Sequence, residues 1–307
     1  MGQSYYYYEG VKTFTSNLDK NQVVYGGVLP MAKMATGDWV RLVIFPLILD
    51  QEIKSSGKSV KTKYIFLVPD WDTDEVQILG SNRFYLKPHG RIYKYQLDPE
   101  GCHENRSDHW ESIFLEDVAA ATEGLEKINI ELIRASSLLS ETSFLDLLRI
   151  ALNQPESIIE LAEKIFGPND SSREPSSLAG PVCRECKYSV GEMEYIKDWD
   201  RIQYSCSRCG NVQEADISEQ EYWVQSEVLE SAALAVIDPT LKIIRENDEY
   251  LNRDSVIEGF IDSNNKGWSD DLDKMVVPFV DSERGGHSIK DLMEFAREWD
   301  KPHAELA

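Results

Sequence analysis

Two pairs of cysteines constrain the fold of this chain more than any other feature. Cys183 and Cys186 form the first pair, Cys206 and Cys209 form the second, and 19 residues separate the pairs. Two residues between cysteines let one tight turn point both sulfurs at the same ion, and two such turns complete a tetrahedron. The spacing therefore predicts one structural Zn²⁺ held by four thiolates. Such a closed site stabilises a small segment and leaves the function of the protein open.

Disulfides and a redox-active CxxC motif are the alternative uses of these cysteines. The motif occurs twice, and the sequence does not begin with a basic segment followed by an apolar one, which would indicate secretion. No apolar run reaches the length of about eighteen residues that a membrane-spanning helix needs. We therefore favour zinc, and we expect a cytoplasmic protein that makes no contact with a membrane.

The second cysteine pair, followed directly by Gly210, resembles the CxxCG knuckle of zinc ribbons, and the residues between the pairs alternate like a long hairpin. The resemblance covers residues 182–214, and no family is recognised for the rest of the chain. It implies a zinc-ribbon fold for this segment. Because zinc ribbons occur in transcription, replication and tRNA-modifying or tRNA-charging proteins, it also implies a bias toward nucleic-acid machinery. The first pair departs from the pattern, with Lys187 in the place of the glycine.

The remaining sequence predicts an α+β protein of several domains. The first 115 residues are rich in aromatic and β-branched residues, which favours a β-barrel or sandwich. Helical periodicity and a Ser/Pro-rich stretch follow before the cysteines. The expected division is a β-rich domain at 1–115, a helical segment at 116–167, a linker at 168–181, the zinc ribbon at 182–214 and an acidic, mainly helical domain at 215–307.

Individual elements follow from the same patterns. Pro46 interrupts the most apolar of the expected strands and favours an edge position for it. In the helical segment, Leu125, Ile128, Leu132 and Ile133 share one helical face. The expected strands cover residues 5–8, 23–28, 39–49, 64–68, 76–79, 83–97 and 275–280, and the expected helices behind the cysteines cover 219–236 and 240–251.

The acidic charge of the chain is unevenly distributed. The net charge is −22, from 32 basic and 54 acidic side chains, and residues 215–307 hold 22 of the acidic ones. An anionic protein repels phosphates at long range, so nucleic acid would need a local basic patch. Lys54, Lys58, Lys61 and Lys63 form such a patch beside aromatic residues that could stack on bases. The alternative is that these lysines only keep an edge strand soluble.

Three carboxylates are the best indication of an enzyme. Asp70, Asp72 and Asp74 follow an apolar strand at a spacing of two, so an extended strand would place them on one face, where they could hold Mg²⁺. Proline and threonine neighbours make an acidic turn the favoured alternative. The chain has no Walker, GxGxxG or GxSxG motif, which lowers the expectation of an enzyme.

Two further features concern metal binding and protein docking. Cys102 and His103 with His109 offer three zinc ligands, but no fourth ligand is obvious nearby, so we interpret Cys102 as a lone thiol. Trp199 lies at the expected hairpin tip between the cysteine pairs, where it could dock a protein.

The favoured function is a zinc-binding, non-enzymatic accessory subunit of a nucleic-acid-handling complex. Its β-rich front or ribbon would bind nucleic acid and its acidic back would bind protein partners. The alternatives are an assembly protein with a purely structural zinc, and a Mg²⁺-dependent enzyme that uses Asp70, Asp72 and Asp74.

Overall fold

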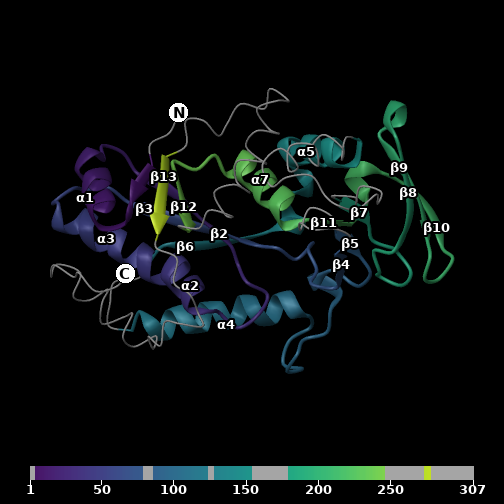
Figure 1. Ribbon diagram of the computed structural model, residues 1–307, viewed down its shortest axis with the longest axis horizontal. Coiled ribbons are helices and arrows are strands. Elements are labelled where there is room, and N and C mark those ends of the chain that lie inside the picture. Colours follow the sequence, from purple (N-terminus) through teal and green to yellow (C-terminus); the bar gives the residue numbers. More distant parts are fainter. Residues whose placement is uncertain (1–3, 79–85, 124–127, 154–178, 246–272, 278–307) are drawn as a thin grey trace.

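The core of the protein is an open sheet of six strands in which every neighbouring pair is parallel (Figure 1). The computed structural model describes residues 4–78, 86–123, 128–153, 179–245 and 273–277. Across the sheet, the strands are β1 (Ser4–Tyr6), β13 (Asp273–Val277), β12 (Leu241–Arg245), β2 (Gln22–Val28), β3 (Thr62–Val68) and β6 (Ile130–Arg134). The expected β-barrel or sandwich is therefore not confirmed, and the fold class is mixed α/β.

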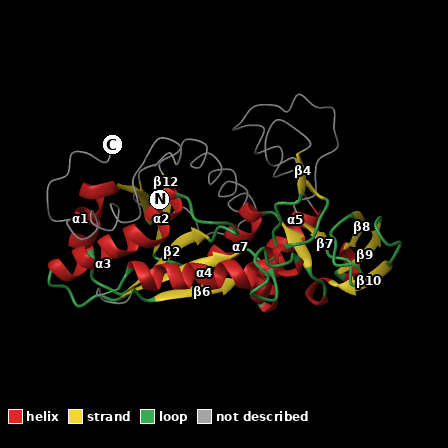
Figure 2. Ribbon diagram, turned by 90° about the horizontal axis from the view of Figure 1, so that it is seen from below, coloured by secondary structure: helices red, strands yellow, loops and turns green. Residues whose placement is uncertain are grey.

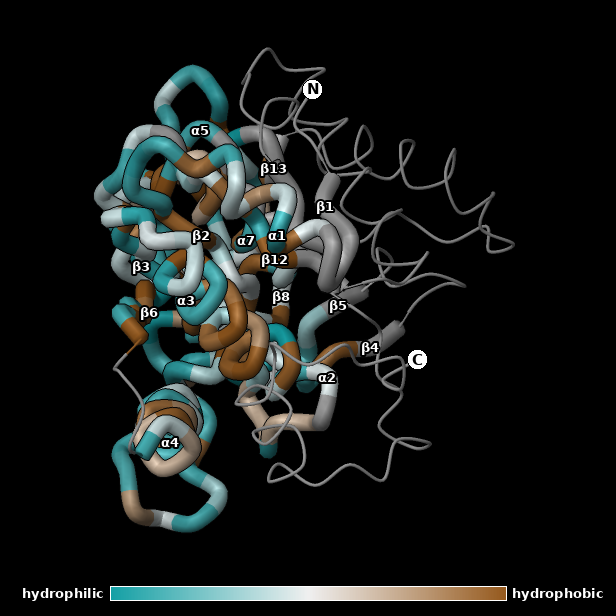
Figure 3. The backbone as a smooth tube through the Cα atoms, turned by 90° about the vertical axis from the view of Figure 1, so that its left-hand side faces the viewer, coloured by the Kyte–Doolittle hydropathy of each residue, from teal (hydrophilic) through white to brown (hydrophobic). Residues whose placement is uncertain are grey.

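Helices cover both faces of this sheet. Phe66 of β3 packs against Phe114 on one face, with ring centroids 5.6 Å apart, while its neighbour Leu67 is buried in a separate core on the other face. The helices of the first face are α1 (Tyr7–Asn17), α2 (Thr36–Trp39), α3 (Phe45–Ser55) and α4 (Arg106–Ala121), and those of the second are α5 (Thr142–Asn153) and α7 (Ser226–Ile237). Figure 2 shows α3 and α4 lying along the same face, and Figure 3 shows hydrophobic segments concentrated around the central strands.

The expected strand at 39–49 is wrong, because these residues are helical. Residues 40–44 form a π-helical turn, η1 (Val40–Ile44), that joins α2 to α3. Every residue from Val40 to Leu49 is buried, so the apolar run has no polar face to reveal its period. Pro46 lacks the N–H that an α-helix would direct to Leu42, and the wider π turn accommodates that loss.

Other expectations differ for related reasons. The expected helical face at Ile128 to Ile133 is wrong where it enters strand β6, and the expected helix at 240–251 is wrong where it enters β12. Short runs of β-branched residues carry no reliable period, and pairing with β3 or β2 decides their conformation. The helix expected at 219–236 begins only at Ser226, after β11 (Tyr222–Val224).

Several expected strands are confirmed. Strands β2 and β3 match the predictions at 23–28 and 64–68, and β13 matches the described part of 275–280. Residues 5–6 lie in β1, but residues 7–8 begin helix α1. In the described part of the strand expected at 83–97, residues 86–88 form β5 (Leu86–Pro88), paired with β4 (Val76–Ile78), and η2 (Tyr93–Tyr95) is a 3₁₀ turn.

The cysteine segment, residues 182–214, is inserted between the two halves of the sheet. It follows β6 and α5 in the chain and precedes α7 and β12. Strands β8 (Gly191–Ile196), β9 (Arg201–Cys206) and β10 (Val212–Asp216) form its antiparallel sheet, and β7 (Ala179–Pro181) pairs with β11 at its base. Most of the expected linker, residues 168–178, lies outside the described residues. Within the described residues, no helix is long and apolar enough to cross a membrane.

Candidate active site at the carboxyl edge of the sheet

The order of the strands locates a candidate site. From β2 the chain proceeds outward through β3 to β6, then returns to the other side of β2 and proceeds through β12 to β13. In a doubly wound sheet, ligands bind outside the carboxyl ends of the strands at the point where this direction reverses. That point lies between β2 and β12. The loop at residues 29–35 after β2 adjoins it, and residues 69–75 after β3 and 135–140 after β6 follow along the same carboxyl edge of the sheet.

Two glycines shape the end of β2. Gly27 has a φ of +104°, and a Cβ atom there would lie 2.0 Å from Nη1 of Arg41. A Cβ atom at Gly26 would lie 2.0 Å from the ring of Phe66. Arg41 is buried, and its guanidinium donates to the carbonyl oxygen of Val28 at 2.9 Å. A buried cation therefore packs against the backbone of β2 at the reversal point, in space that only glycine leaves open.

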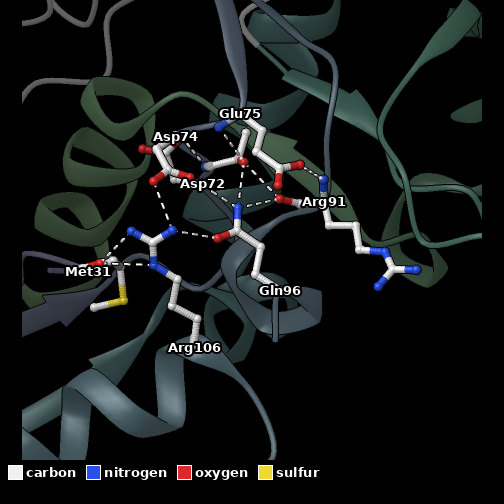
Figure 4. Close-up of polar contacts among 8 residues, drawn as sticks. Met31, Asp72, Asp74, Glu75, Arg91, Gln96 and Arg106 are labelled. Atoms are coloured by element: carbon white, nitrogen blue, oxygen red, sulfur yellow. Dashed lines mark hydrogen bonds and ion pairs between the residues drawn. The ribbon is translucent and has the colours of Figure 1, made fainter. Parts of the chain in front are cut away.

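Arg106 joins the loop after β2 to the loop after β3 (Figure 4). It is the first residue of α4, and its Nε and Nη2 atoms donate to the carbonyl oxygen of Met31 at 3.0 and 2.8 Å. Its Nη1 atom donates to Oε1 of Gln96 at 2.8 Å and pairs with Oδ2 of Asp74 at 2.8 Å. Because one planar guanidinium makes all four contacts, the two loops hold a fixed relative position.

The loop after β3 is further ordered by Gln96, which is buried. Its Nε2 atom donates to Oγ1 of Thr73 at 3.0 Å and to the carbonyl oxygen of Arg91 at 2.8 Å. The hydroxyl of Thr73 donates to the same carbonyl at 2.7 Å. Sequence reasoning missed both Gln96 and Arg106, because a polar residue between a 3₁₀ turn and a helix carries no motif.

The three carboxylates of the loop after β3 do not converge. Asp70 accepts from the backbone N–H of Ser136 at 2.9 Å and from its hydroxyl, which fastens the loop after β6. Asp72 accepts from Trp223 Nε1 at 3.3 Å and from the hydroxyl of Ser226, which fastens the start of α7. Asp74 pairs with Arg106.

Each of these carboxylates therefore fastens a different segment to the carboxyl edge. Among the described residues, the groups whose donor atoms converge closely enough for a metal ion lie elsewhere. Asp70 is almost completely buried, and burial raises its pKa above the ordinary value while the hydrogen bonds from Ser136 oppose that shift. These carboxylates connect separate segments of the chain through hydrogen bonds and an ion pair, and this arrangement gives no support to a Mg²⁺ site.

The four paired cysteines meet at one end of the cysteine segment. The sulfurs of Cys183 and Cys209 lie 3.6 Å apart, as do those of Cys186 and Cys206. Sulfurs held about 2.3 Å from one zinc ion would be about 3.8 Å apart, so the donor set fits tetrahedral zinc. Although burial raises the pKa of Cys183, the backbone N–H groups of Cys186 and Glu185 lower it to about 7, whereas burial raises the pKa of Cys186.

The first knuckle departs from the CxxCG pattern in its sequence but not in its backbone conformation. Lys187 has a φ of +63°, and Gly210 in the second knuckle has a φ of +73°. In both knuckles the N–H of this residue donates to the carbonyl oxygen of the first cysteine at 3.0 Å. The lysine thus adopts the conformation for which glycine is usually selected. Trp199, at the turn between β8 and β9, is 68% exposed, and its role in docking a protein stays a prediction.

The lysines expected to bind nucleic acid lie at the opposite edge of the sheet. Lys54, Lys58, Lys61 and Lys63 occupy the end of α3, the connection to β3 and the start of β3. Lys58 donates to the carbonyl oxygens of Ser16 and Leu18, and Lys63 pairs with Glu131. At least two of the four cations are therefore used within the protein, and none lies beside the carboxyl-edge loops.

A different basic surface adjoins those loops. Arg91 and Arg208 lie over the ring of Tyr188, with Cζ atoms 5.0 and 3.6 Å from the ring centroid. Lys187 lies over the ring of Tyr95 at 4.9 Å. The tyrosine–cation patch thus joins the cysteine segment to the loop that leads into α4. Its members are Arg91, Lys94, Tyr95, Lys187, Tyr188 and Arg208.

Comparisons with known proteins give a family. The model of a family described as tRNA synthetases class I (K) matches residues 41–225, which is more than half of the chain. A crystal structure of arginyl-tRNA synthetase from Plasmodium falciparum aligns with 86% of this chain at 12% identity, with a TM-score of 0.34. This chain spans 43% of the length of that structure, and a likeness of this degree establishes no shared activity. No curated protein matches the chain.

The family match overturns two expectations. A family is recognised well beyond residues 182–214, so the interpretation of an isolated zinc ribbon in an otherwise unrecognised chain is wrong. A match to a family of aminoacylation enzymes likewise contradicts a non-enzymatic accessory subunit. The matched residues include α3, β3, α4 and β6 as well as the cysteines, so the cysteine segment is part of the same family architecture.

Proposed function

We propose that this chain, which belongs to the family of tRNA synthetases class I (K), is an aminoacylation enzyme or the nucleotide-binding part of one. In this reaction an amino acid is activated by ATP and then transferred to tRNA. The letter K in the family description is the code for lysine, and lysine is the amino acid we propose as substrate. The single observation that carries the proposal is the family match over residues 41–225.

The geometry of the sheet supports the proposal independently of any motif. A doubly wound parallel sheet binds nucleotides at the reversal point of its strand order, and here that point adjoins the loop held by Arg41 and Arg106. Lys33 is exposed on the same loop, and we assign it as a cation for the phosphates of ATP. We assign the ATP and amino-acid site to the loops after β2, β3 and β6.

The zinc of the cysteine segment is a structural part of this proposal. Cys183, Cys186, Cys206 and Cys209 would hold one Zn²⁺, and their four sulfurs leave no open position for substrate. When bound, the ion would cross-link the two knuckles, and it would take no part in the reaction. Its place in the function is to hold Tyr188 and Arg208 beside the carboxyl-edge loops.

We assign the contact with tRNA to the tyrosine–cation patch. Its four cations and two aromatic rings have the composition that binds single-stranded RNA, in which bases stack and phosphates meet positive charge. The acidic remainder of the chain makes such a local patch necessary, because the net charge is −22. Glu221 offsets part of this positive charge, because it pairs with Lys94 at 2.6 Å and accepts from the hydroxyl of Tyr95.

The first experiment is lysine-dependent exchange of radioactive pyrophosphate into ATP, followed by charging of total tRNA. We expect exchange that requires lysine, and charging that requires tRNA. Failure of every one of the proteinogenic amino acids to support either exchange or AMP release, with tRNA present, would contradict the proposal.

The second experiment tests the tyrosine–cation patch. Replacement of Arg91, Lys187 and Arg208 by alanine should weaken tRNA binding and reduce the slope of log K against log salt by about one for each lost phosphate contact. The matched control is Lys54→Ala, Lys61→Ala and Lys63→Ala at the other edge of the sheet. If only the control variant loses binding, the assignment is wrong and the sequence-based lysine patch takes its place.

A further inference from the structure

Two buried glutamines lie between the first cysteine knuckle and the base of the cysteine segment. They are Gln213 of β10 and Gln220, directly before β11, and they are 8% and 2% exposed. Oε1 of Gln213 accepts from the backbone N–H of Arg184 inside the knuckle at 2.9 Å, and its Nε2 donates to Oε1 of Gln220 at 2.8 Å. Gln220 in turn donates through Nε2 to the carbonyl oxygens of Val182 and Glu221, at 2.8 and 2.7 Å. The two side chains thus connect the knuckle to the ends of β7 and β11.

Backbone groups at both ends fix the orientation of the two amides. The N–H of Arg184 can only donate a hydrogen bond, so it must face the side-chain oxygen of Gln213. The carbonyl oxygens of Val182 and Glu221 can only accept, so they must face the side-chain nitrogen of Gln220. Turning either amide over would leave buried polar atoms unpaired, which costs free energy. A buried network that is satisfied in only one arrangement holds its two ends in a fixed relative position.

The two cysteine knuckles differ in what holds them. In the second knuckle, the residue after the first cysteine is Ser207, and its N–H donates to the backbone carbonyl oxygen of Val190 at 3.0 Å. The corresponding residue of the first knuckle is Arg184, and its N–H donates to the side chain of Gln213. The shape of the first knuckle therefore depends on a side chain that a single substitution can change.

The network also reaches one of the four sulfurs. Nδ2 of Asn211 donates to Oε1 of Gln213 at 3.2 Å and lies 3.7 Å from Sγ of Cys183, as a donor to the sulfur. Groups that hydrogen-bond to metal ligands orient those ligands, and their loss typically weakens metal binding by about 10- to 100-fold. Asn211 and Gln213 therefore have the contacts expected of residues that support a metal site.

At its other end the network reaches the tyrosine–cation patch. The carbonyl oxygen of Glu221 accepts from the N–H of Val182 at 2.8 Å as well as from Gln220. The carboxylate of Glu221 pairs with Lys94 at 2.6 Å and accepts from the hydroxyl of Tyr95. Glu221 is thus the residue at which the glutamine network meets the patch.

We propose that Gln213 and Gln220 are positioning residues that couple the four-cysteine site to the tyrosine–cation patch. At one end they place the first knuckle for the metal, and at the other they place Glu221, which holds Lys94 and Tyr95. Occupation of the four-cysteine site therefore orders the patch. The inference rests on the zinc and the patch assigned under the proposed function, and it adds the side chains that connect them.

The first test is the rate at which the full chain loses zinc to a strong chelator. Gln213→Glu keeps the shape of the side chain and the acceptor for Arg184, but it sets a second oxygen against two acceptors, the carbonyl oxygen of Val182 and Oε1 of Gln220. We expect zinc loss roughly tenfold faster than in the wild type. The matched control is Gln203→Glu, at an exposed position on the neighbouring strand β9, and it should leave the rate unchanged.

Equal rates of zinc loss in the two glutamate variants would overturn the coupling while leaving the zinc assignment intact. A wild-type chain that binds no zinc would contradict the zinc assignment itself, and this inference with it.

Hydrogen exchange of the wild-type protein tests the coupling without a variant that could fail to fold. After the chelator has removed zinc, we expect faster exchange in residues 220–224 and 93–96 as well as in the knuckles, with residues 54–63 at the amino edge unchanged. The measurement uses neither tRNA nor an amino acid, so its outcome does not depend on the proposed reaction. Exchange that becomes faster only within residues 183–212 would show that the network does not reach the patch, and would overturn the proposal.

Discussion

The two edges of the central sheet are made from the same strands and differ in how their loops are held. At the amino edge, Lys58 donates to two backbone carbonyls and Lys63 pairs with Glu131 at the surface. At the carboxyl edge, Arg41 is buried against β2, and Asp70 and Arg106 tie together loops that are distant in sequence. Exposed pairs contribute little to stability, whereas buried charged groups hold one geometry and are costly to disturb.

This difference indicates which edge of the sheet has its loops held in one fixed geometry. A surface that only ends the strands needs no buried cation and no carboxylate with a partner in another loop. A binding site does, because ligands must meet groups that are already in position. The contrast between the edges therefore supports the carboxyl edge as the site, and it can be tested by making matched changes at both.

The largest effect is expected from alanine at two of the positive-φ glycines, one at each edge of the sheet. Gly57 lies at the amino edge with a φ of +70° and open space around it, so Gly57→Ala should cost about 1 kcal/mol from backbone strain alone. Gly27→Ala adds a collision with Arg41 and should cost roughly 3 kcal/mol or more. Urea unfolding of both variants gives the comparison. Equal losses of unfolding free energy in the two variants would show that the end of β2 accommodates a Cβ atom as easily as an exposed turn does.

The next effect concerns Arg106. In Arg106→Ala the loops after β2 and β3 lose their shared partner, and we expect roughly a 10²-fold loss of aminoacylation, the scale of a misplaced active-site group. Arg106→Lys should restore only part of it, because a lysine cannot make the planar set of contacts. An unchanged rate in Arg106→Ala would separate this network from the site.

The pH dependence of stability isolates Asp70. Its pKa is raised in the folded protein, so the folded state retains this proton to higher pH than the unfolded state does. Stability contributed at Asp70 is therefore present below the ordinary carboxyl pKa and decreases as pH rises through the folded value. Urea unfolding between pH 4 and 7 should show the stability of the wild type falling relative to Asp70→Asn as pH rises. A difference that does not vary with pH would contradict this shift.

The smallest effect is expected at the amino edge. Lys63→Ala removes an ion pair in which both side chains are more than 40% exposed, and screening by water leaves it worth at most about 0.5 kcal/mol. Neither stability nor aminoacylation should change beyond that. A loss comparable to that of Arg106→Ala would remove the distinction between the two edges.

The sequence predicted those parts of the fold whose residue types strongly favour a single kind of structure. β2 and β3 carry β-branched and aromatic residues and are central strands, and the cysteine spacing brought four sulfurs together as expected. It could not predict the parallel order of the sheet, because β12 lies more than 200 residues from its partner β2. It also misassigned the run around Pro46, where burial on every side hides the helical period.

The site was harder to predict than the fold. Asp70, Asp72 and Asp74 were singled out as a Mg²⁺ site or an acidic turn, but their partners Ser136, Ser226 and Arg106 are distant residues that only the fold brings near. Asp98 is different, because it lies only four residues before Cys102, and its carboxylate is the fourth donor beside Cys102, His103 and His109 that the sequence did not make obvious.

Hydrogen exchange with a bound ligand tests the central assignment most directly. The full chain would be exchanged with and without a non-hydrolysable analogue of lysyl-adenylate, and protection mapped by mass spectrometry. We predict protection in residues 29–35, 69–75 and 135–140 at the carboxyl edge, with residues 54–63 at the amino edge unchanged. Binding of the analogue that protects the amino edge, or that leaves all three carboxyl-edge loops unprotected, would contradict this account.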